Sequence, residues 1–76
     1  NIGTKFEGLM SNNLRVYGTI TKIAKNSQTG GYDLLFRDET GVIGSGKPGN
    51  EYGFDTGVNR EIYDLGYKVI DKFPWE

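Results

Sequence analysis

The sequence lacks cysteine and histidine altogether, and only two of its 76 residues are proline. Without cysteine there is no disulfide and no thiolate metal ligand, and without histidine there is no imidazole ligand or general base. The same absences exclude Ser–His–Asp and Cys–His nucleophile systems. We therefore expect a non-enzymatic protein with no metal or cofactor. Its apolar core alone has to stabilise a domain close to the lower size limit.

Long apolar runs are also missing, since no stretch approaches the ~20 residues of a membrane span. Hydrophobic residues make up 36% of the chain and charged residues 25%. Five tyrosines, four phenylalanines and one tryptophan are spread along it, which is typical of a folded chain rather than a disordered one. We expect one small β domain over residues 1–76 that does not bind a membrane. The absence of cysteine does not determine the cellular compartment of the protein.

β-Branched residues and period-two alternation predict several short strands joined by glycine-rich turns. The strongest is Leu14–Lys25, in which Val16 and Ile20 share one face. Ile23 is out of phase with these residues, so we expect a β-bulge near Thr21–Lys22 to restore its direction. The other expected elements are an edge strand at 4–9, strands at 32–37, 42–44 and 67–73, turns at 26–31 and 38–41, and a short helix at 58–65.

The aromatic residues divide between core and surface according to the phase of their strands. Phe36 and Tyr32 lie on one face of their strand, so we expect both in the core, where large rings contribute most. Tyr17 is out of phase with the apolar face of its strand, so its ring is the one expected at the surface. Phe73 and Trp75 are expected to cover the core.

Half of the twelve glycines lie between Gly41 and Gly57, which predicts a long loop. It begins with the P-loop spacing G-x-x-x-x-G-K, but Pro48 stands where serine or threonine is needed. The sequence Pro48-Gly49-Asn50 also does not favour the helix that should begin there. Glu51 and Asp55 match neither an EF-hand nor a catalytic carboxylate pair, so we interpret them as solvated charges. Long loops in compact domains are often functional. The loop residues expected to contact a ligand are Lys47, Tyr52 and Phe54.

Charge is unevenly distributed, although the formal net charge is only −1. Basic residues are in excess from 14 to 37, and acidic residues are in excess from 48 onward. Cations interleaved with aromatic rings are typical of surfaces that bind single-stranded nucleic acid, because bases stack on the rings and cations contact the phosphates. The expected nucleic-acid-binding residues are Arg15, Tyr17, Lys22, Lys25 and Arg37.

Two motifs, VYGTITKI at 16–23 and GYDLLFRDETGVI at 31–43, resemble the first strand and the second strand and turn of OB-fold proteins. The resemblance implies a five-stranded barrel that binds single-stranded nucleic acid, oligosaccharides or proteins on the face of strands two and three. The expected order of elements differs, because four strands precede the helix and one follows it. That order resembles an SH3-like barrel. Both resemblances imply an all-β fold, a small and strongly bent five-stranded barrel with one short helix.

These features favour a binding module, with single-stranded DNA or RNA as the leading partner. The location stays open: cytoplasmic for a nucleic-acid-binding protein, and exported or in a virion for a structural module. The alternative is a protein-interaction or structural module of a larger exported or phage assembly, in which the domain binds a protein partner or a neighbouring domain. A third alternative, carbohydrate binding through tyrosine and asparagine, has fewer residues in its favour. Nucleic-acid binding is distinguished by its steep dependence on salt.

Overall fold

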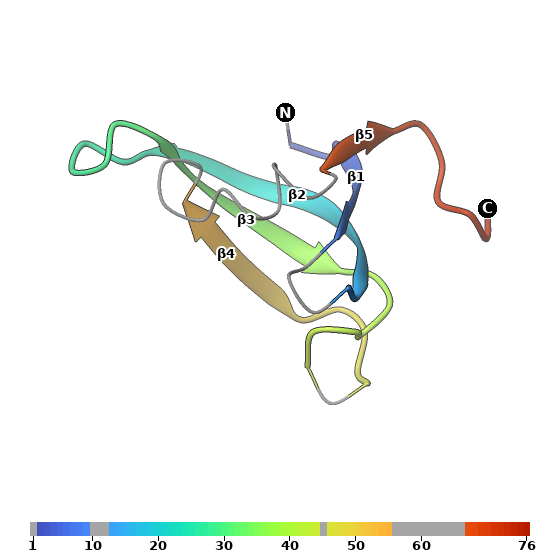
Figure 1. The fold of residues 1–76 in the computed structure, drawn as a ribbon. Helices are drawn as coiled ribbons and strands as arrows, with labels where there is room; N and C mark the ends of the chain where they lie inside the picture. Colours follow the sequence, from blue (N-terminus) through green and yellow to red (C-terminus); the bar gives the residue numbers. More distant parts are fainter. Residues whose placement is uncertain (1, 10–12, 45, 56–66) are drawn as a thin grey trace.

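The computed structural model describes residues 2–9, 13–44, 46–55 and 67–76. These residues form one antiparallel sheet of five strands in the order β4-β3-β2-β1-β5 (Figure 1). The all-β fold expected from the sequence is therefore confirmed. The strands are β1 (Lys5–Leu9), β2 (Arg15–Lys25), β3 (Tyr32–Asp38), β4 (Glu51–Asp55) and β5 (Lys68–Ile70).

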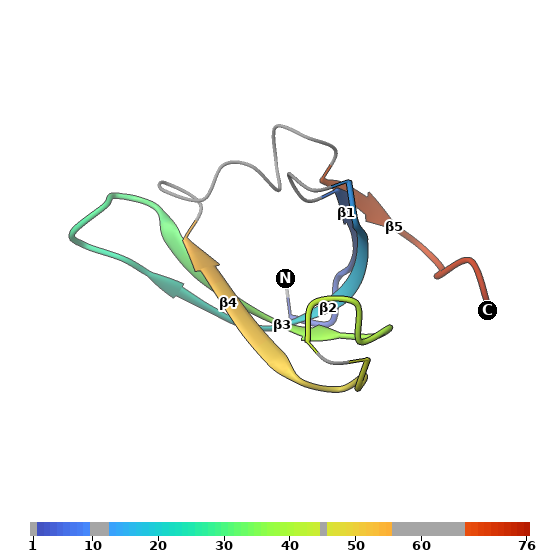
Figure 2. The ribbon, with the colours of Figure 1, turned by 60° about the horizontal axis from the view of Figure 1, so that its bottom comes forward.

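The long strand β2 is the centre of the sheet and pairs with a different neighbour at each end. Residues 15–19 pair with β1, and residues 18–25 pair with β3. The register shifts between Ile20 and Lys22, which confirms the expected β-bulge and sets Ile23 opposite Leu34. A bulge increases local twist. Figure 2 shows that β1 and β5 accordingly stand at an angle to the ribbon of β3 and β4.

β4 and β5 are the two edges of the sheet, and they lie on opposite sides of its curved body (Figure 2). No strand pairing among the described residues joins them, so this part of the chain is an open, curved sheet rather than a closed barrel. The helix expected at 58–65 lies outside the described residues. Within the described part, no helix is long and apolar enough to cross a membrane.

The apolar core lies on one face of the sheet and is built from β1, β2 and β3. Its buried members are Phe6, Val16, Ile20, Leu34 and Phe36. The rings of Phe6 and Phe36 meet edge to face with centroids 5.2 Å apart. A Cβ on Gly18 would lie 2.7 Å from the Phe6 ring and 2.9 Å from the Phe36 ring. Gly18 therefore provides the space in which the two rings meet, in addition to backbone freedom.

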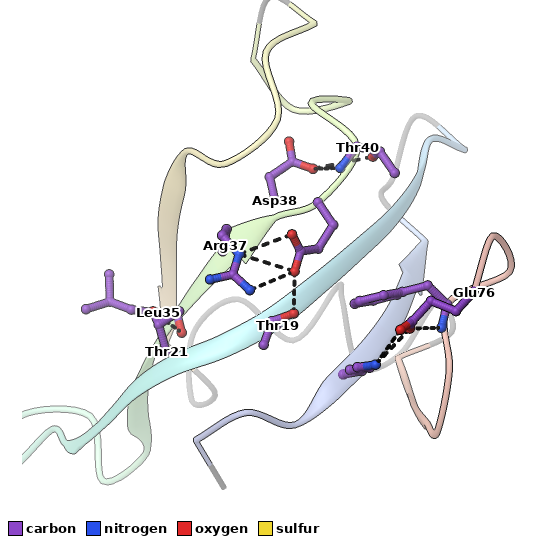
Figure 3. Close-up of polar contacts among 10 residues, drawn as sticks. Thr19, Thr21, Leu35, Arg37, Asp38, Thr40 and Glu76 are labelled. Carbon is purple, nitrogen blue, oxygen red and sulfur yellow. Dashed lines mark hydrogen bonds and ion pairs between the residues drawn. The ribbon is translucent and has the colours of Figure 1, made fainter.

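The carboxylate of Asp38 organises the turn after β3 (Figure 3). It is fully buried, and it accepts the backbone N–H groups of Thr40, Gly41 and Ile43 at 3.1, 3.0 and 3.1 Å. Gly41 has a φ of 77°, which favours glycine and turns the chain back. The strand expected at 42–44 is therefore wrong, because the Ile43 amide binds Asp38. The next antiparallel pairing is made by β4 instead.

Two further expectations about the strands are corrected. The 4–9 segment forms β1, but β1 lies between β2 and β5 rather than at an edge. Tyr32 is 48% exposed rather than part of the core, whereas Phe36 is buried as expected. Tyr32 pairs with Lys25 beside the hairpin turn, at the end of the ladder away from the buried cluster. The hairpin of β2 and β3 therefore extends beyond the core, and Tyr32 lies in the part that the core does not cover.

Candidate functional site

The face of the sheet opposite the core, called the outer face from here on, carries a row of polar side chains. Residues paired across strands point to the same face of a sheet. Lys5, Thr19 and Arg37 pair with one another across β1, β2 and β3. Ile70 of β5 and Glu51 of β4 extend this row to the two edges. The sheet thus brings together side chains that lie far apart in the sequence.

An aromatic cluster covers the outer face beside this row. Tyr17 of β2 meets the rings of Phe73 and Trp75 edge to face, at centroid distances of 6.3 and 5.4 Å. Phe73 and Trp75 stack on each other with centroids 4.8 Å apart. Phe73 is 6% exposed and Trp75 is 54% exposed. The expectation that these two residues cover the core is therefore wrong, because they pack against Tyr17 on the opposite face.

A pocket of about 350 Å³ opens beside the polar row and the aromatic cluster, and we call it the outer-face site. Strands β1, β2 and β3 and the turn after β3 supply one part of its lining, and residues that follow β5 supply the rest. Its volume is at the lower end of the range for ligand pockets, so it suits a side chain or a small group. The lining residues are Lys5, Thr19, Arg37, Glu39, Phe73, Trp75 and Glu76.

Each charged side chain of the outer-face site has a partner of opposite sign within the site. The guanidinium of Arg37 donates to Glu39 from Nε and Nη2, at distances of 3.0 to 3.2 Å. The hydroxyl of Thr19 donates to the same carboxylate at 2.6 Å (Figure 3). Lys5 Nζ lies 2.7 and 3.0 Å from the two carboxylate oxygens of Glu76. The site is therefore neutral overall, and its charges are held in place by one another.

Hydrogen bonds favour the ionised form of both carboxylates. The hydrogen bond from Arg37 lowers the pKa of Glu39, and the bond from Thr19 adds to this effect while partial burial opposes it. The hydrogen bond from Lys5 lowers the pKa of Glu76. The charge of Glu76 acts in the opposite direction on the pKa of Glu39, so the two carboxylates lie close enough to influence each other.

Stability is expected to depend on pH through these two carboxylates. A glutamate whose pKa is lowered on folding stabilises the protein above its unfolded pKa of about 4.3, and this contribution is lost as the pH falls through the folded pKa. The unfolding free energy from urea titrations should therefore decrease below about pH 4.3. Glu39→Gln should make this decrease shallower, because it removes one of the two groups. A wild-type pH dependence in the Glu39→Gln variant would contradict the assignment.

The five residues expected to bind nucleic acid do not share one surface. Arg15, Tyr17 and Arg37 belong to the outer-face residues of β2 and β3. Lys22 also belongs to this face, but it lies beyond the bulge. Lys25 lies on the core side of the sheet near the hairpin turn. Side chains alternate between the two faces along a strand, and the pairing of β2 with β3 has no further register shift after the bulge. The bulge and the long hairpin therefore divide the expected basic face.

Two of these cations are already paired. Arg15 Nη1 lies 2.9 Å from Glu7, and Arg37 is bound by Glu39. Tyr17 also belongs to this region, and its pKa is raised first by desolvation and then by a hydrogen bond with Glu7. Nothing in the sequence pattern indicated these pairs, since Glu7 and Glu39 lie on either side of the basic segment along the chain.

The three residues assigned to the loop lie in different elements. Lys47 is an exposed loop residue, as expected. Tyr52 and Phe54 belong to β4, so the expectation of a loop continuing to residue 57 is wrong for the residues that form this strand. The Tyr52 ring packs on the core side, with its centroid 6.2 Å from that of Phe36. Neither Lys47 nor Tyr52 lines the outer-face site.

Six residues of the site were missed by sequence reasoning: Lys5, Thr19, Glu39, Phe73, Trp75 and Glu76. Thr19 carried a usable signal, since it shares a strand face with Tyr17 by period-two alternation. Lys5 and Glu76 carried none, because 71 positions separate them in the chain and only the folding of the segment after β5 joins them.

The described residues contain no group of three acidic side chains that could hold a metal ion. No protein-family model, curated protein or solved structure matches the chain in comparisons with each. Function is therefore inferred from the geometry of the outer-face site.

Proposed function

We propose that this protein is a non-enzymatic protein-interaction module and that a segment of its partner binds at the outer-face site. The observation that carries this proposal is the aromatic cluster on the face away from the core, where Trp75 is 54% exposed. Tryptophan and tyrosine are enriched among the residues that contribute most to binding at protein interfaces. A partner whose side chains pack against Tyr17 here would bury apolar surface beside polar groups of the strands that are already held in place.

The charge pattern also favours a protein over a nucleic acid. Lys5, Arg15 and Arg37 each form an ion pair with a glutamate. A phosphate backbone would have to compete with these carboxylates, which reduces the attraction expected from the cations. The polar and charged groups of a peptide can instead align with the alternating charges of the face.

The strand count supports an SH3-like architecture for this module rather than an OB fold. Among the described residues, four strands precede residue 56, and β5 follows residue 66 and pairs with β1. An OB fold has two strands after its helix, whereas an SH3-like barrel has one. SH3 domains bind extended peptides in aromatic-lined grooves, so this analogy agrees with the proposed partner class.

A random peptide library displayed on phage, selected on the full chain, tests the proposal. We expect enriched peptides whose affinity falls at least about tenfold in Arg37→Ala and in Tyr17→Ala, as for truncated hot-spot residues. Lys25→Ala, which alters a hairpin residue outside the site, is the matched control and should bind as the wild type does. The proposal fails if no peptide family is enriched, or if folded Arg37→Ala and Tyr17→Ala chains bind the peptides unchanged.

Single-stranded nucleic acid is a second proposal, because two cations of β2 lie outside the ion pairs. Lys22 and Lys25 are exposed, and neither forms an ion pair with a carboxylate among the described residues. Tyr32, paired with Lys25, adds a half-exposed ring. A poly-dT oligonucleotide titrated with the full chain should then bind at about 50 mM salt and dissociate as the salt concentration rises. Lys22→Glu with Lys25→Glu should abolish that binding, and no binding at the lower salt would exclude this function.

A further inference from the structure

We propose that residues 71–76 are an internal ligand of the outer-face site, and that the partner is a peptide of the same chemistry, with aromatic residues followed by an acidic residue. This inference rests on the proposed protein-interaction function and specifies its partner. The segment follows β5, which ends at Ile70, and Figure 1 shows it leaving the sheet there. It nevertheless contributes two rings and a carboxylate to the site.

Phe73 is the main anchor of the segment. Its side chain is 6% exposed, although it belongs to no strand. Its ring meets Tyr17 edge to face, and Lys5 Nζ lies 5.1 Å from its centroid, within the range of a cation–π contact. Trp75 stacks on the outer side of this arrangement and also meets Tyr17. Tyr17 and Lys5 therefore form a surface that accepts aromatic side chains from a segment outside the sheet.

Glu76 supplies the acidic part of the internal ligand. Its carboxylate binds Lys5 Nζ through both oxygens, at 2.7 and 3.0 Å. It also accepts the backbone N–H of Phe73 at 2.9 Å, which sets the carboxylate at a fixed position relative to the buried ring. The pairing with Lys5 is specific for negative charge, so a partner that replaces the segment would need an acid at this position.

Side chains hold the segment in place. Its backbone hydrogen bond runs from the N–H of Glu76 to the carbonyl of Phe73, inside the segment itself, at 3.1 Å. Among the described residues, no backbone hydrogen bond joins residues 73–76 to a strand. A peptide with the same side chains can therefore make the same contacts, and the internal segment can leave without breaking the ladder of the sheet.

The internal segment competes with any partner that binds at the site. A covalently attached ligand acts at an effective concentration of about millimolar, so it masks the site from a weak partner. The apparent affinity for a partner falls in proportion to the fraction of molecules with an open site. Truncating the side chains of the segment itself should therefore strengthen binding of an added peptide, the opposite of the effect expected for a residue that only contacts the partner.

The wild-type chain gives the first test, because Trp75 is its only tryptophan. The probe is the peptide acetyl-Asp-Lys-Phe-Pro-Trp-Glu-amide, which has the sequence of residues 71–76. Added unlabelled to the ¹⁵N-labelled full chain, it should shift the indole N–H signal of Trp75 in a saturable way as the internal segment is displaced. An unshifted signal with the peptide at several millimolar, above the effective concentration of the segment, would overturn the inference.

An opened chain gives the second test. The variant with Phe73→Ala and Trp75→Phe contains no tryptophan, so the fluorescence of the peptide reports binding directly. We expect it to bind the peptide about tenfold to a hundredfold more tightly than the matched Trp75→Phe chain, from the loss of one buried phenylalanine. Should circular dichroism show that the opened chain is unfolded, Glu76→Gln in the Trp75→Phe chain replaces it, with an expected gain of about twofold to fivefold.

Charge reversal distinguishes recognition from a structural role of Lys5. Lys5→Glu in the folded host should weaken binding of the peptide, and a peptide ending in lysine instead of glutamate should restore it. A role of Lys5 in folding alone would not be rescued by the reversed peptide. If each host, with and without the Lys5→Glu substitution, bound both peptides equally well, the inference would be overturned.

The outcomes separate this inference from the function on which it rests. If library peptides depend on Arg37 and Tyr17 but carry no aromatic–acidic pattern, and the segment peptide does not bind, the protein-interaction function holds and this inference fails. If neither the library nor the segment peptide binds at the outer face, both fail. If the segment peptide binds with the expected dependence on Lys5, both are supported.

Discussion

Phe6→Ala is expected to lower the free energy of unfolding by about 3–5 kcal/mol, the usual cost of truncating a buried phenylalanine. Phe6 is fully buried, meets Phe36 edge to face at 5.2 Å and stacks on Tyr67 at 5.1 Å. It therefore connects β1 to β3 and to the residue that precedes β5. A chain of this length has a total stability of roughly 4–11 kcal/mol, so the variant should lose from about a quarter of it to all of it.

Urea unfolding followed by circular dichroism measures this effect, with Phe6→Leu as a control that keeps most of the volume and should cost less. A double-mutant cycle with Gly18→Ala gives a sharper check. A Cβ at position 18 would lie 2.7 Å from the Phe6 ring, so Gly18→Ala should cost less when residue 6 is alanine. The same cost in both backgrounds would contradict the packing described for Phe6 and Gly18.

Asp38→Ala is expected to lower the free energy of unfolding by about 2–4 kcal/mol, because it leaves backbone donors without their charged acceptor. The Asp38 carboxylate accepts three backbone N–H groups of the following turn. Its own N–H donates to Asn50 at 2.8 Å, and its carbonyl accepts from Gly49 at 2.7 Å. Loss of the carboxylate should therefore loosen both the turn after β3 and the chain that leads into β4.

Two variants control this prediction. Asp38→Asn keeps one oxygen acceptor but turns an amide N–H toward one of the backbone donors, so its cost should lie between zero and that of Asp38→Ala. Asp33→Ala removes an exposed carboxylate from the same strand and should change stability by about 0.5 kcal/mol or less. Equal costs for Asp33→Ala and Asp38→Ala in urea unfolding would show that the buried turn does not depend on Asp38.

The two faces of the sheet have different roles in these predictions. Phe6 and Asp38 act through burial, so their removal should reduce stability whatever the protein binds. Arg37 and Tyr17 lie on the outer face, where truncation should reduce binding more than stability. Measuring both quantities for each variant therefore separates a binding surface from the core that supports it.

Most strands were predictable because their signals are local. β-Branched residues and alternation predicted β2 to within one residue, and the phase of Ile23 predicted its bulge. β4 was not predictable by these rules, since Gly53 interrupts its five residues and glycines precede it. The false strand at 42–44 has a matching cause: its apolar residues suggest pairing, but the buried carboxylate of Asp38 takes the amide of Ile43.

The site was predictable only in part. Alternation identified Tyr17 as a residue away from the core, and Arg37 was selected for its charge. The partners that neutralise Arg15 and Arg37 come from Glu7 on β1 and Glu39 in a turn, and no sequence periodicity relates them. Phe73 and Trp75 were expected to cover the core, but the apolar character of a segment does not specify which face of a sheet it covers.

The sequence by itself determined the absence of thiol and imidazole chemistry, the all-β class and the position of the bulge in β2. These follow from composition and from alternation, which act over a few residues. Tertiary structure alone decided that Lys5, Thr19 and Arg37 form one row, that glutamates pair with Arg15 and Arg37 of the expected basic face, and that Phe73 and Trp75 pack beside Tyr17. The physical reason is register: pairing between strands joins residues that are distant in the chain, and one-dimensional periodicity contains no information on it.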